Sequence, residues 1–339
     1  MPATIKDVAK KAGVSISTVS RVINDSKPVS PESRRKVLDA IKKLNYQPNE
    51  VARSLVTKKS KLIGVIVDDI GSHYVAQIVR GIEEIGRMYD YDILLSSSYG
   101  NPETESRFVK LLMTKQVEGI ILVSEILNTK LLDYMEDMNM KFIYWNKYYN
   151  IESLDTIVLD HKKAMTDIMD YLIENNHKNI MYVSQELEGV DNIEVEKIEA
   201  YEDCLKSISS KSHVYTLEGR ATYQAYNAGE DILDIIRKEN ITAVVCCHDN
   251  IAIGLNNYFY DNNIEVGKDI SLVGYGDIKS ASICRPSLTT IREPYYDIGA
   301  VAVRRILKSI ENSKIDSRDD SEIVLPMRLI ERKSTNKAK

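Results

Sequence analysis

From Leu62 onward, short apolar runs alternate with longer segments whose apolar residues recur every three or four positions. The short runs have the length and composition of buried strands, and the longer segments have the period of amphipathic helices. Strands are predicted at 62–68, 91–97, 119–123, 142–145, 156–159, 179–183, 213–217, 242–247, 270–274 and 287–291. Helices are predicted at 74–89, 103–115, 129–138, 161–175, 193–209, 222–238, 248–262 and 294–312. This alternation is typical of an α/β fold in which helices cover both faces of parallel sheets. About ten strands favour two sheets, with a ligand cleft between two subdomains.

The charge of the chain is distributed unevenly. The 339 residues are 43% hydrophobic, enough to bury a large core and to form two or three domains. Residues 1–61 hold fourteen Lys and Arg against five Asp and Glu, a net +9, which leaves −14 for the rest. A basic head on an acidic body indicates a nucleic-acid-binding module joined to a second function.

The basic head carries the start and stop signals of three short helices. These helices are predicted at 4–11, 15–24 and 31–44. Thr4 is expected to cap the first with Asp7 as its capping-box partner, Gly13 to take a left-handed turn, and Ser15 to cap the second. The side chains expected to face inward are Ile5, Val8, Ala9, Ala12, Val19, Val22, Ile23, Val37, Leu38, Ile41 and Leu44.

The second helix is then expected to expose Ile16, Ser17, Ser20 and Arg21. Two short helices joined by a tight turn form a helix-turn-helix, whose second helix enters the major groove of DNA. Arg21 is a candidate for a bidentate contact with guanine. Ile16 has two interpretations of equal weight, contact with a thymine methyl group or ordinary core packing.

Segment 49–56 follows Pro48 and spans only about two helical turns. An isolated helix needs roughly 12–15 residues to be stable in water. This segment is therefore expected to become ordered only with a partner.

Several other classes of protein are not favoured. No run approaches 18 apolar residues and no apolar signal region follows Met1, so a cytoplasmic protein is expected. The spacing of the cysteines is typical of neither metal ligands nor disulfides. Free buried thiols are therefore expected, and a metal site is not expected. The cysteines are Cys204, Cys246, Cys247 and Cys284.

Catalytic motifs are also missing. The run Gly274-Tyr275-Gly276-Asp277 begins like a dinucleotide loop but lacks the third glycine, and neither a P-loop nor a nucleophile elbow is present. His248-Asp249 is read as a helix cap rather than a catalytic pair. The chain is not expected to be an enzyme or to hold a cofactor.

The head resembles that of the lactose/galactose repressor family of transcription regulators. The matching runs are Thr4-Ile5-Lys6-Asp7-Val8-Ala9, Gly13-Val14-Ser15, Thr18-Val19-Ser20-Arg21-Val22-Ile23-Asn24 and Asn49-x-x-Ala52-Arg53-Ser54-Leu55. In that family the last run is a hinge helix that folds on the operator, and its leucine, here Leu55, wedges into the minor groove. The DNA-contacting residues that the resemblance implies are Thr4, Ser15, Ile16, Ser17, Thr18, Arg21, Asn24, Asn49, Ala52, Arg53 and Leu55.

The resemblance covers essentially the whole chain. It implies a periplasmic-binding-protein-like core of two doubly wound subdomains, between which the chain crosses three times. The expected parts are a helix-turn-helix domain at 1–48, a hinge helix and linker at 49–60, one core subdomain at 61–160 plus 293–322, and another at 161–292 plus 323–334.

Members of the family usually bind a small sugar in the cleft, through an arginine and a carboxylate. The matching positions here are Lys197 and Gly276, although Asp277 offers a neighbouring carboxylate. Lysine lacks the planar fork of arginine, and glycine provides no acceptor for a hydroxyl. A tight sugar site is therefore not favoured, and the candidate cleft residues are Lys197, Asp249 and Asp277.

The stretch from Tyr295 to Lys308, with shorter runs elsewhere, resembles the branch of the family that serves carbon catabolite control. That branch uses the serine-phosphorylated phosphocarrier protein HPr as corepressor. Arg304 and Lys308 lie one turn apart, so they could hold one phosphate, although most such pairs are simply solvated. The corepressor contacts that the resemblance implies are Asp69, Tyr89, Tyr296, Asp297, Arg304 and Lys308.

The expected function is therefore transcription regulation by a homodimer on a pseudo-palindromic operator, because two-fold symmetry requires matching half-sites. A sugar-responsive repressor of the same family is the alternative. A sugar-binding transport protein would require an export signal, which is not found.

Overall fold

The computed structural model describes residues 3–25, 27–47, 59–150, 157–187, 189, 192–311 and 323–338. The chain divides into two compact units, residues 1–61 and 62–339. Within the described residues no helix is long and apolar enough to cross a membrane.

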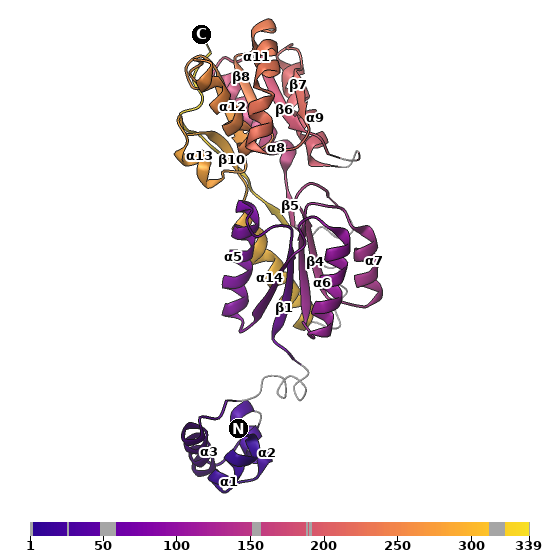
Figure 1. Ribbon diagram of the computed structural model, residues 1–339, viewed down its shortest axis with the longest axis vertical. Coiled ribbons are helices and arrows are strands. Elements are labelled where there is room, and N and C mark those ends of the chain that lie inside the picture. Colours follow the sequence, from indigo (N-terminus) through magenta and orange to yellow (C-terminus); the bar gives the residue numbers. More distant parts are fainter. Residues whose placement is uncertain are drawn as a thin grey trace. The chain divides into compact units, whose positions relative to one another are not determined.

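In its described residues, the first unit contains three helices packed around a small apolar core (Figure 1). They are α1 (Ile5–Ala12), α2 (Ile16–Asn24) and α3 (Pro31–Leu44). Thr4 and Asp7 form the predicted capping box, and Gly13 ends α1 at φ 67°. Ser15 caps α2 as expected.

One core assignment in this unit was wrong. Leu38 is 51% exposed, whereas Val37 and Ala40 are buried. Positions three or four apart share a helix face, so Val37, Ala40, Ile41 and Leu44 form the packed stripe and Leu38 points away from it.

The second unit contains two main sheets. The first is parallel throughout, in the order β2-β1-β3-β4. Its strands are β1 (Leu62–Val67), β2 (Asp92–Ser97), β3 (Gly119–Ser124) and β4 (Phe142–Asn146). Side chains alternate across β1, so Ile63 and Val65 pack against one pair of helices and Ile66 against the other. The first pair is α5 (His73–Met88) and α14 (Tyr295–Glu311), and the second is α6 (Pro102–Thr114) and α7 (Thr129–Asp137).

The second sheet has the order β12-β10-β9-β8-β6-β7, in which only the β10–β12 pairing is antiparallel. Its strands are β6 (Ile180–Gln185), β7 (Val214–Leu217), β8 (Ala243–Cys246), β9 (Ser271–Tyr275), β10 (Thr289–Arg292) and β12 (Arg328–Ile330). Its helices are α8 (His161–Glu174), α9 (Ile193–Ser207), α10 (Thr222–Asn227), α11 (Gly229–Lys238), α12 (Asp249–Asp261) and α13 (Lys279–Ile283).

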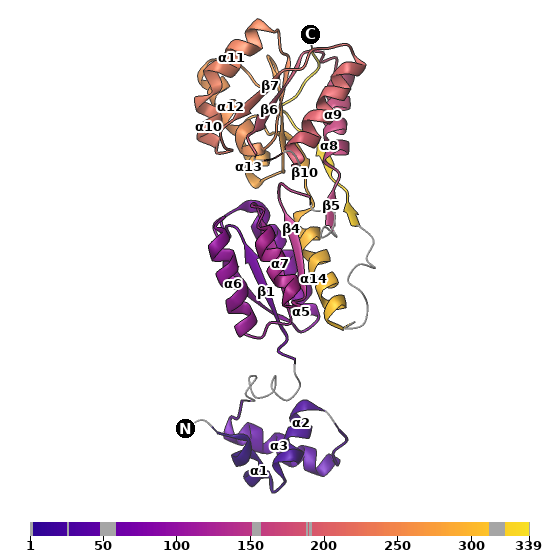
Figure 2. The same cartoon turned by 90° about the vertical axis from the view of Figure 1, so that its right-hand side faces the viewer.

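A pair of short strands lies apart from both sheets. β5 (Ile157–Leu159) pairs in parallel with β11 (Ile323–Leu325), and Figure 2 shows this pair between the two sheets. The α/β architecture with parallel sheets is as predicted.

Some elements differ from the prediction. The single helix expected at 222–238 is divided at Ala228, next to Gly229, a poor helix former. A Cβ atom at Gly229 would lie 2.2 Å from the ring of Tyr258, so glycine is required for this close packing. The short strands β11 and β12 and the short helix α13 were not predicted.

Cys246 and Cys247 are buried free thiols, as expected, whereas Cys204 and Cys284 are only partly buried. Burial raises the pKa of the Cys246 and Cys247 thiols well above the usual range. These two thiols are therefore inert groups of the core.

Helices α5 and α14 approach each other at two glycines. A Cβ atom at Gly299 would lie 2.0 Å from the carbonyl oxygen of Ile78, and one at Gly81 would lie 2.2 Å from that of Tyr296. Both obstacles are backbone atoms, so neither can rotate away. The two glycines therefore set the separation of the helices.

Replacing Gly299 with alanine is expected to force the two helices apart and to destabilise the body by about 1–3 kcal/mol, the usual cost of overpacking. The measurement is the free energy of unfolding in urea. Gly86→Ala is the matched control, because its Cβ would lie 3.2 Å from the flexible end of the Ile93 side chain and at an ordinary contact distance, 3.5 Å, from the carbonyl oxygen of Tyr91. Equal stability of the two variants would show that the helix contact can relax.

Candidate nucleic-acid interface, partner surface and ligand cleft

The exposed side of α2 is built from its N-terminal residues. The Ser15 hydroxyl accepts a hydrogen bond from the Thr18 amide at 3.1 Å and so fixes the start of the helix. Ile16 is 45% exposed, so the core-packing interpretation of this residue is wrong. Ser17 and Arg21 are also exposed.

The polar groups of this unit that are predicted to contact DNA differ in their contacts within the chain. Arg21 forms no ion pair within the part of the chain that the structure describes. The side-chain amide of Asn24 donates to Ser20 at 3.2 Å, and the Thr4 hydroxyl donates to Asp7 at 2.7 Å. The N-terminus of α2 exposes hydroxyls and one apolar side chain, and Arg21 is exposed in its last turn. Such a helix can contact base edges and phosphates. The other predicted DNA contacts, Asn49, Ala52, Arg53 and Leu55, lie outside the described residues.

The α5–α14 surface, defined by the exposed sides of these two helices, carries most of the predicted corepressor contacts. Asp297, Arg304 and Lys308 are exposed on α14 at helical spacings of seven and four, so they share one side of the helix. Tyr296 donates from its hydroxyl to Glu84 of α5 at 2.8 Å. The structure thereby brings Tyr296 together with the neighbouring helix.

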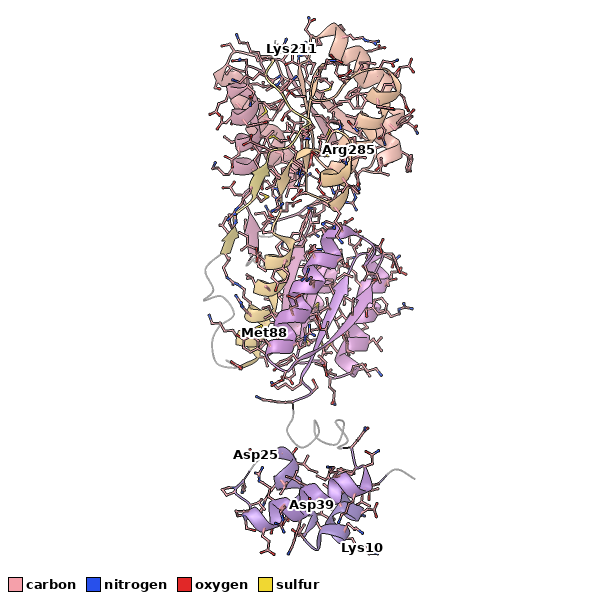
Figure 3. All side chains as sticks on the ribbon, turned by 90° about the vertical axis from the view of Figure 1, so that its left-hand side faces the viewer. Lys10, Asp25, Asp39, Met88, Lys211 and Arg285 are labelled. Atoms are coloured by element: carbon pink, nitrogen blue, oxygen red, sulfur yellow. The ribbon has the colours of Figure 1, made fainter. Side chains whose placement is uncertain are left out.

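Two other predicted contacts lie at the ends of α5. Tyr89 follows the helix and is 50% exposed, and Met88 before it, labelled in Figure 3, is 74% exposed. Asp69 precedes the helix, where its carboxylate accepts the Gly71 amide at 2.8 Å. Asp69 therefore shapes a turn of its own loop.

The exposed charges of α5 were missed at the sequence level. Arg80 donates to Glu84 at 2.8 Å, and Arg87 donates to Glu83 at 2.8 Å. The (i, i+4) spacing of both pairs was visible in the sequence, but nothing there placed them beside α14. A hollow of about 360 Å³ opens next to this surface, lined among others by His73, Lys279, Arg292, Tyr296 and Asp297.

The candidate cleft residues are all bonded to other groups of the chain. Lys197 is buried and donates to Glu194 at 2.8 Å, with its ammonium 4.1 Å from the centre of the Tyr275 ring. Burial alone would lower the pKa of Lys197, but the opposing charges, Glu194 foremost, outweigh it and raise the pKa. Lys197 is therefore a paired cation within the core.

Asp249 and Asp277 are engaged in the same way. Asp249 accepts the Thr290 hydroxyl at 2.6 Å and the Ile278 amide at 2.8 Å, and burial raises its pKa to about 7. Asp277 accepts from Arg292 and from Arg332, each at 2.6 Å. Both carboxylates are therefore already bonded to groups of the chain.

A second buried ion pair was not predicted at all. Lys147 donates to both carboxylate oxygens of Glu293 at 2.7 and 2.8 Å, and to the Tyr295 hydroxyl at 2.7 Å. The Glu293 carboxylate lies 3.7 Å from the Cβ position of Gly276, where family members usually carry a carboxylate. Burial lowers the pKa of Lys147, and the charge of Glu293 opposes this shift.

Comparisons with known proteins agree with a helix-turn-helix unit joined to an α/β body. Residues 4–49 match the model of the bacterial regulatory proteins of the lacI family, and residues 169–335 match the periplasmic binding protein-like domain. The HTH-type transcriptional regulator RegA of Clostridium saccharobutylicum is 36% identical over 337 residues, covering 99% of this chain and 100% of the relative. Catabolite control protein A of Priestia megaterium is 35% identical with the same coverage.

Among solved structures, the lac repressor dimer bound to operator and an anti-inducer is similar, with a TM-score of 0.85 and 25% identity. The match covers 99% of this chain and 100% of that one. These relatives are regulators of transcription and not enzymes. The full-length matches and the exposed recognition helix together show that this chain belongs to the lacI family of DNA-binding transcription regulators.

Proposed function

We propose that this regulator serves carbon catabolite control, as a homodimer on a pseudo-palindromic operator, with serine-phosphorylated HPr as its corepressor. The docking site is the α5–α14 surface. The observation that carries the proposal is the exposed pair Arg304 and Lys308, one turn apart on α14, whose Gly299 packs against α5. Among the described residues, Arg304 has no hydrogen-bonding partner, so its guanidinium is available for a phosphate.

The relatives support the same proposal. One of them is named catabolite control protein A, and its full length matches this chain. The solved lac repressor is a dimer bound to operator, which supports a dimer here. A dimer places two recognition helices on two half-sites, which explains why a two-fold operator is expected.

In the proposed mechanism, docking changes the relative populations of two arrangements of the body. A corepressor can shift this equilibrium only by binding one arrangement more tightly than the other. The favoured arrangement would bring together the two 49–56 segments of a dimer and so lower the cost of ordering them on DNA. Binding of corepressor and of operator would then strengthen each other equally.

Arg304→Ala tests the docking site. We expect the variant to lose the increase in operator affinity caused by serine-phosphorylated HPr, because half of the phosphate clamp is missing, while its basal operator affinity stays unchanged. The measurement is fluorescence anisotropy of labelled operator with and without the phosphoprotein. Arg237→Ala on α11 is the matched control, because Arg237 is an exposed arginine on a helix remote in sequence from the proposed site. Full stimulation of Arg304→Ala would rule out this site.

The alternative, a sugar-responsive repressor, makes a different prediction for the same assay. Operator affinity would respond to a sugar and not to the phosphoprotein. The bonded state of Lys197, Asp249 and Asp277 argues against it, because a sugar would have to displace charge-assisted bonds within the chain.

A further inference from the structure

One ion pair joins the two halves of the body across the cleft. Arg220 precedes α10 in the half built on the six-stranded sheet, and Glu125 follows β3 of the four-stranded sheet. The guanidinium of Arg220 donates to the carboxylate of Glu125. Glu125 also accepts the Tyr74 hydroxyl at 2.8 Å, and Arg220 lies 5.1 Å from the centre of the Tyr148 ring.

The pair is shielded from water on the side of Glu125. The side chain of Glu125 is 11% exposed and that of Arg220 is 34% exposed. An ion pair in such a setting is screened less by solvent than one on an open surface. The tyrosines that hold each partner also limit the side-chain freedom lost when the pair forms.

A backbone hydrogen bond crosses the cleft beside this pair. The amide of Ile193 donates to the carbonyl oxygen of Tyr148 at 3.0 Å. Ile193 is the first residue of α9, and the first amides of a helix have no acceptor within it. The side chain of Asn150 adds a contact to Glu196 at 3.2 Å. Protection of the Ile193 amide therefore reports closure of the cleft.

The interior of the cleft is filled by charges of the chain itself. Lys147 with Glu293, and Lys197 with Glu194, are ion pairs whose side chains are at most 4% exposed. The two ammonium groups lie over the rings of Tyr295 and Tyr275, at 4.8 and 4.1 Å. These buried charges are therefore already paired within the chain.

We propose that Arg220 and Glu125 form a latch that holds the body closed in the absence of any small molecule. Closure is then a property of the chain, and opening requires the ion pair to separate. The latch acts in the ligand-free full-length protein, whatever the identity of the corepressor.

The test is hydrogen exchange of the Ile193 amide in the ligand-free full chain. In the wild type this amide is expected to be protected. In Arg220→Met it is expected to exchange about tenfold faster, because a partly shielded ion pair no longer opposes opening. Glu125→Gln keeps an acceptor for Tyr74 but removes the charge, and it should show an increase in the same direction.

Two comparisons make the result decisive. Lys268→Met removes an exposed ion pair with Glu265 within one half and should leave Ile193 unchanged. The amide of Val244 in the core strand β8 should stay protected in all variants. An unprotected Ile193 amide in the wild type, or equal exchange in wild type and Arg220→Met, would overturn the proposal. If Arg220→Met also lost protection at Val244, the ion pair would stabilise the whole body and would not act as a latch.

Discussion

Lys147→Met is expected to lower the free energy of unfolding by about 3–5 kcal/mol, the usual cost of leaving one member of a buried ion pair without its partner. The variant would leave the Glu293 carboxylate with only the Tyr295 hydroxyl in a site where its side chain is 1% exposed. The double variant Lys147→Met/Glu293→Gln removes both charges and should recover most of the loss.

The measurement is urea unfolding of the full chain followed by circular dichroism. Lys163→Met is the control, because it breaks an exposed (i, i+4) pair with Asp167 and should change stability little. Single and double variants of equal stability would contradict the account, since they would show that the Glu293 charge needs no compensation.

Arg21→Ala is expected to weaken operator binding by roughly 30- to 10⁴-fold at fixed salt, because each bidentate arginine–guanine contact contributes about 1–3 kcal/mol and a dimer makes two. Binding to unrelated DNA should fall much less, since phosphate contacts dominate there. Fluorescence anisotropy with operator and with scrambled DNA measures both quantities.

Lys10→Ala provides the contrast. Lys10, labelled in Figure 3, lies in the last turn of α1 and is exposed, as expected of a phosphate contact. Its loss should weaken binding to both DNAs by a similar factor. If Arg21→Ala also weakened both DNAs equally, Arg21 would be a phosphate contact and not a base reader.

Local signals predicted most of the secondary structure. Thr4, Gly13 and Ser15 define helix ends through contacts with residues three or four positions away, and these ends are confirmed. The recurrence of apolar residues every three or four positions also predicted correctly that the helices pack against the sheets. Short elements such as β12 were missed, because three residues carry too little periodicity and this strand forms only by pairing with β10.

The cleft could not be predicted in the same way. Lys147 and Glu293 are 146 positions apart, and Glu125 and Arg220 are 95 apart. No local pattern links such residues, and each lies outside a recognisable motif. The sequence did show that the usual arginine and carboxylate of a sugar site are replaced at Lys197 and Gly276. It did not show that the carboxylate of Glu293 lies next to the glycine.

The α5–α14 surface was predictable in part. The spacing of Arg304 and Lys308 predicted that they share one side of a helix, and both are exposed. The contact of Tyr296 with Glu84 joins residues 212 positions apart, so it required the fold.

The most direct measurement is the affinity of the full chain for a pseudo-palindromic operator, selected from random DNA, with phosphorylated or unphosphorylated HPr. We expect only the serine-phosphorylated protein to raise the affinity, by about 5- to 150-fold, the usual range of allosteric coupling. An affinity that responds to neither form of HPr, but changes on addition of a sugar, would contradict it.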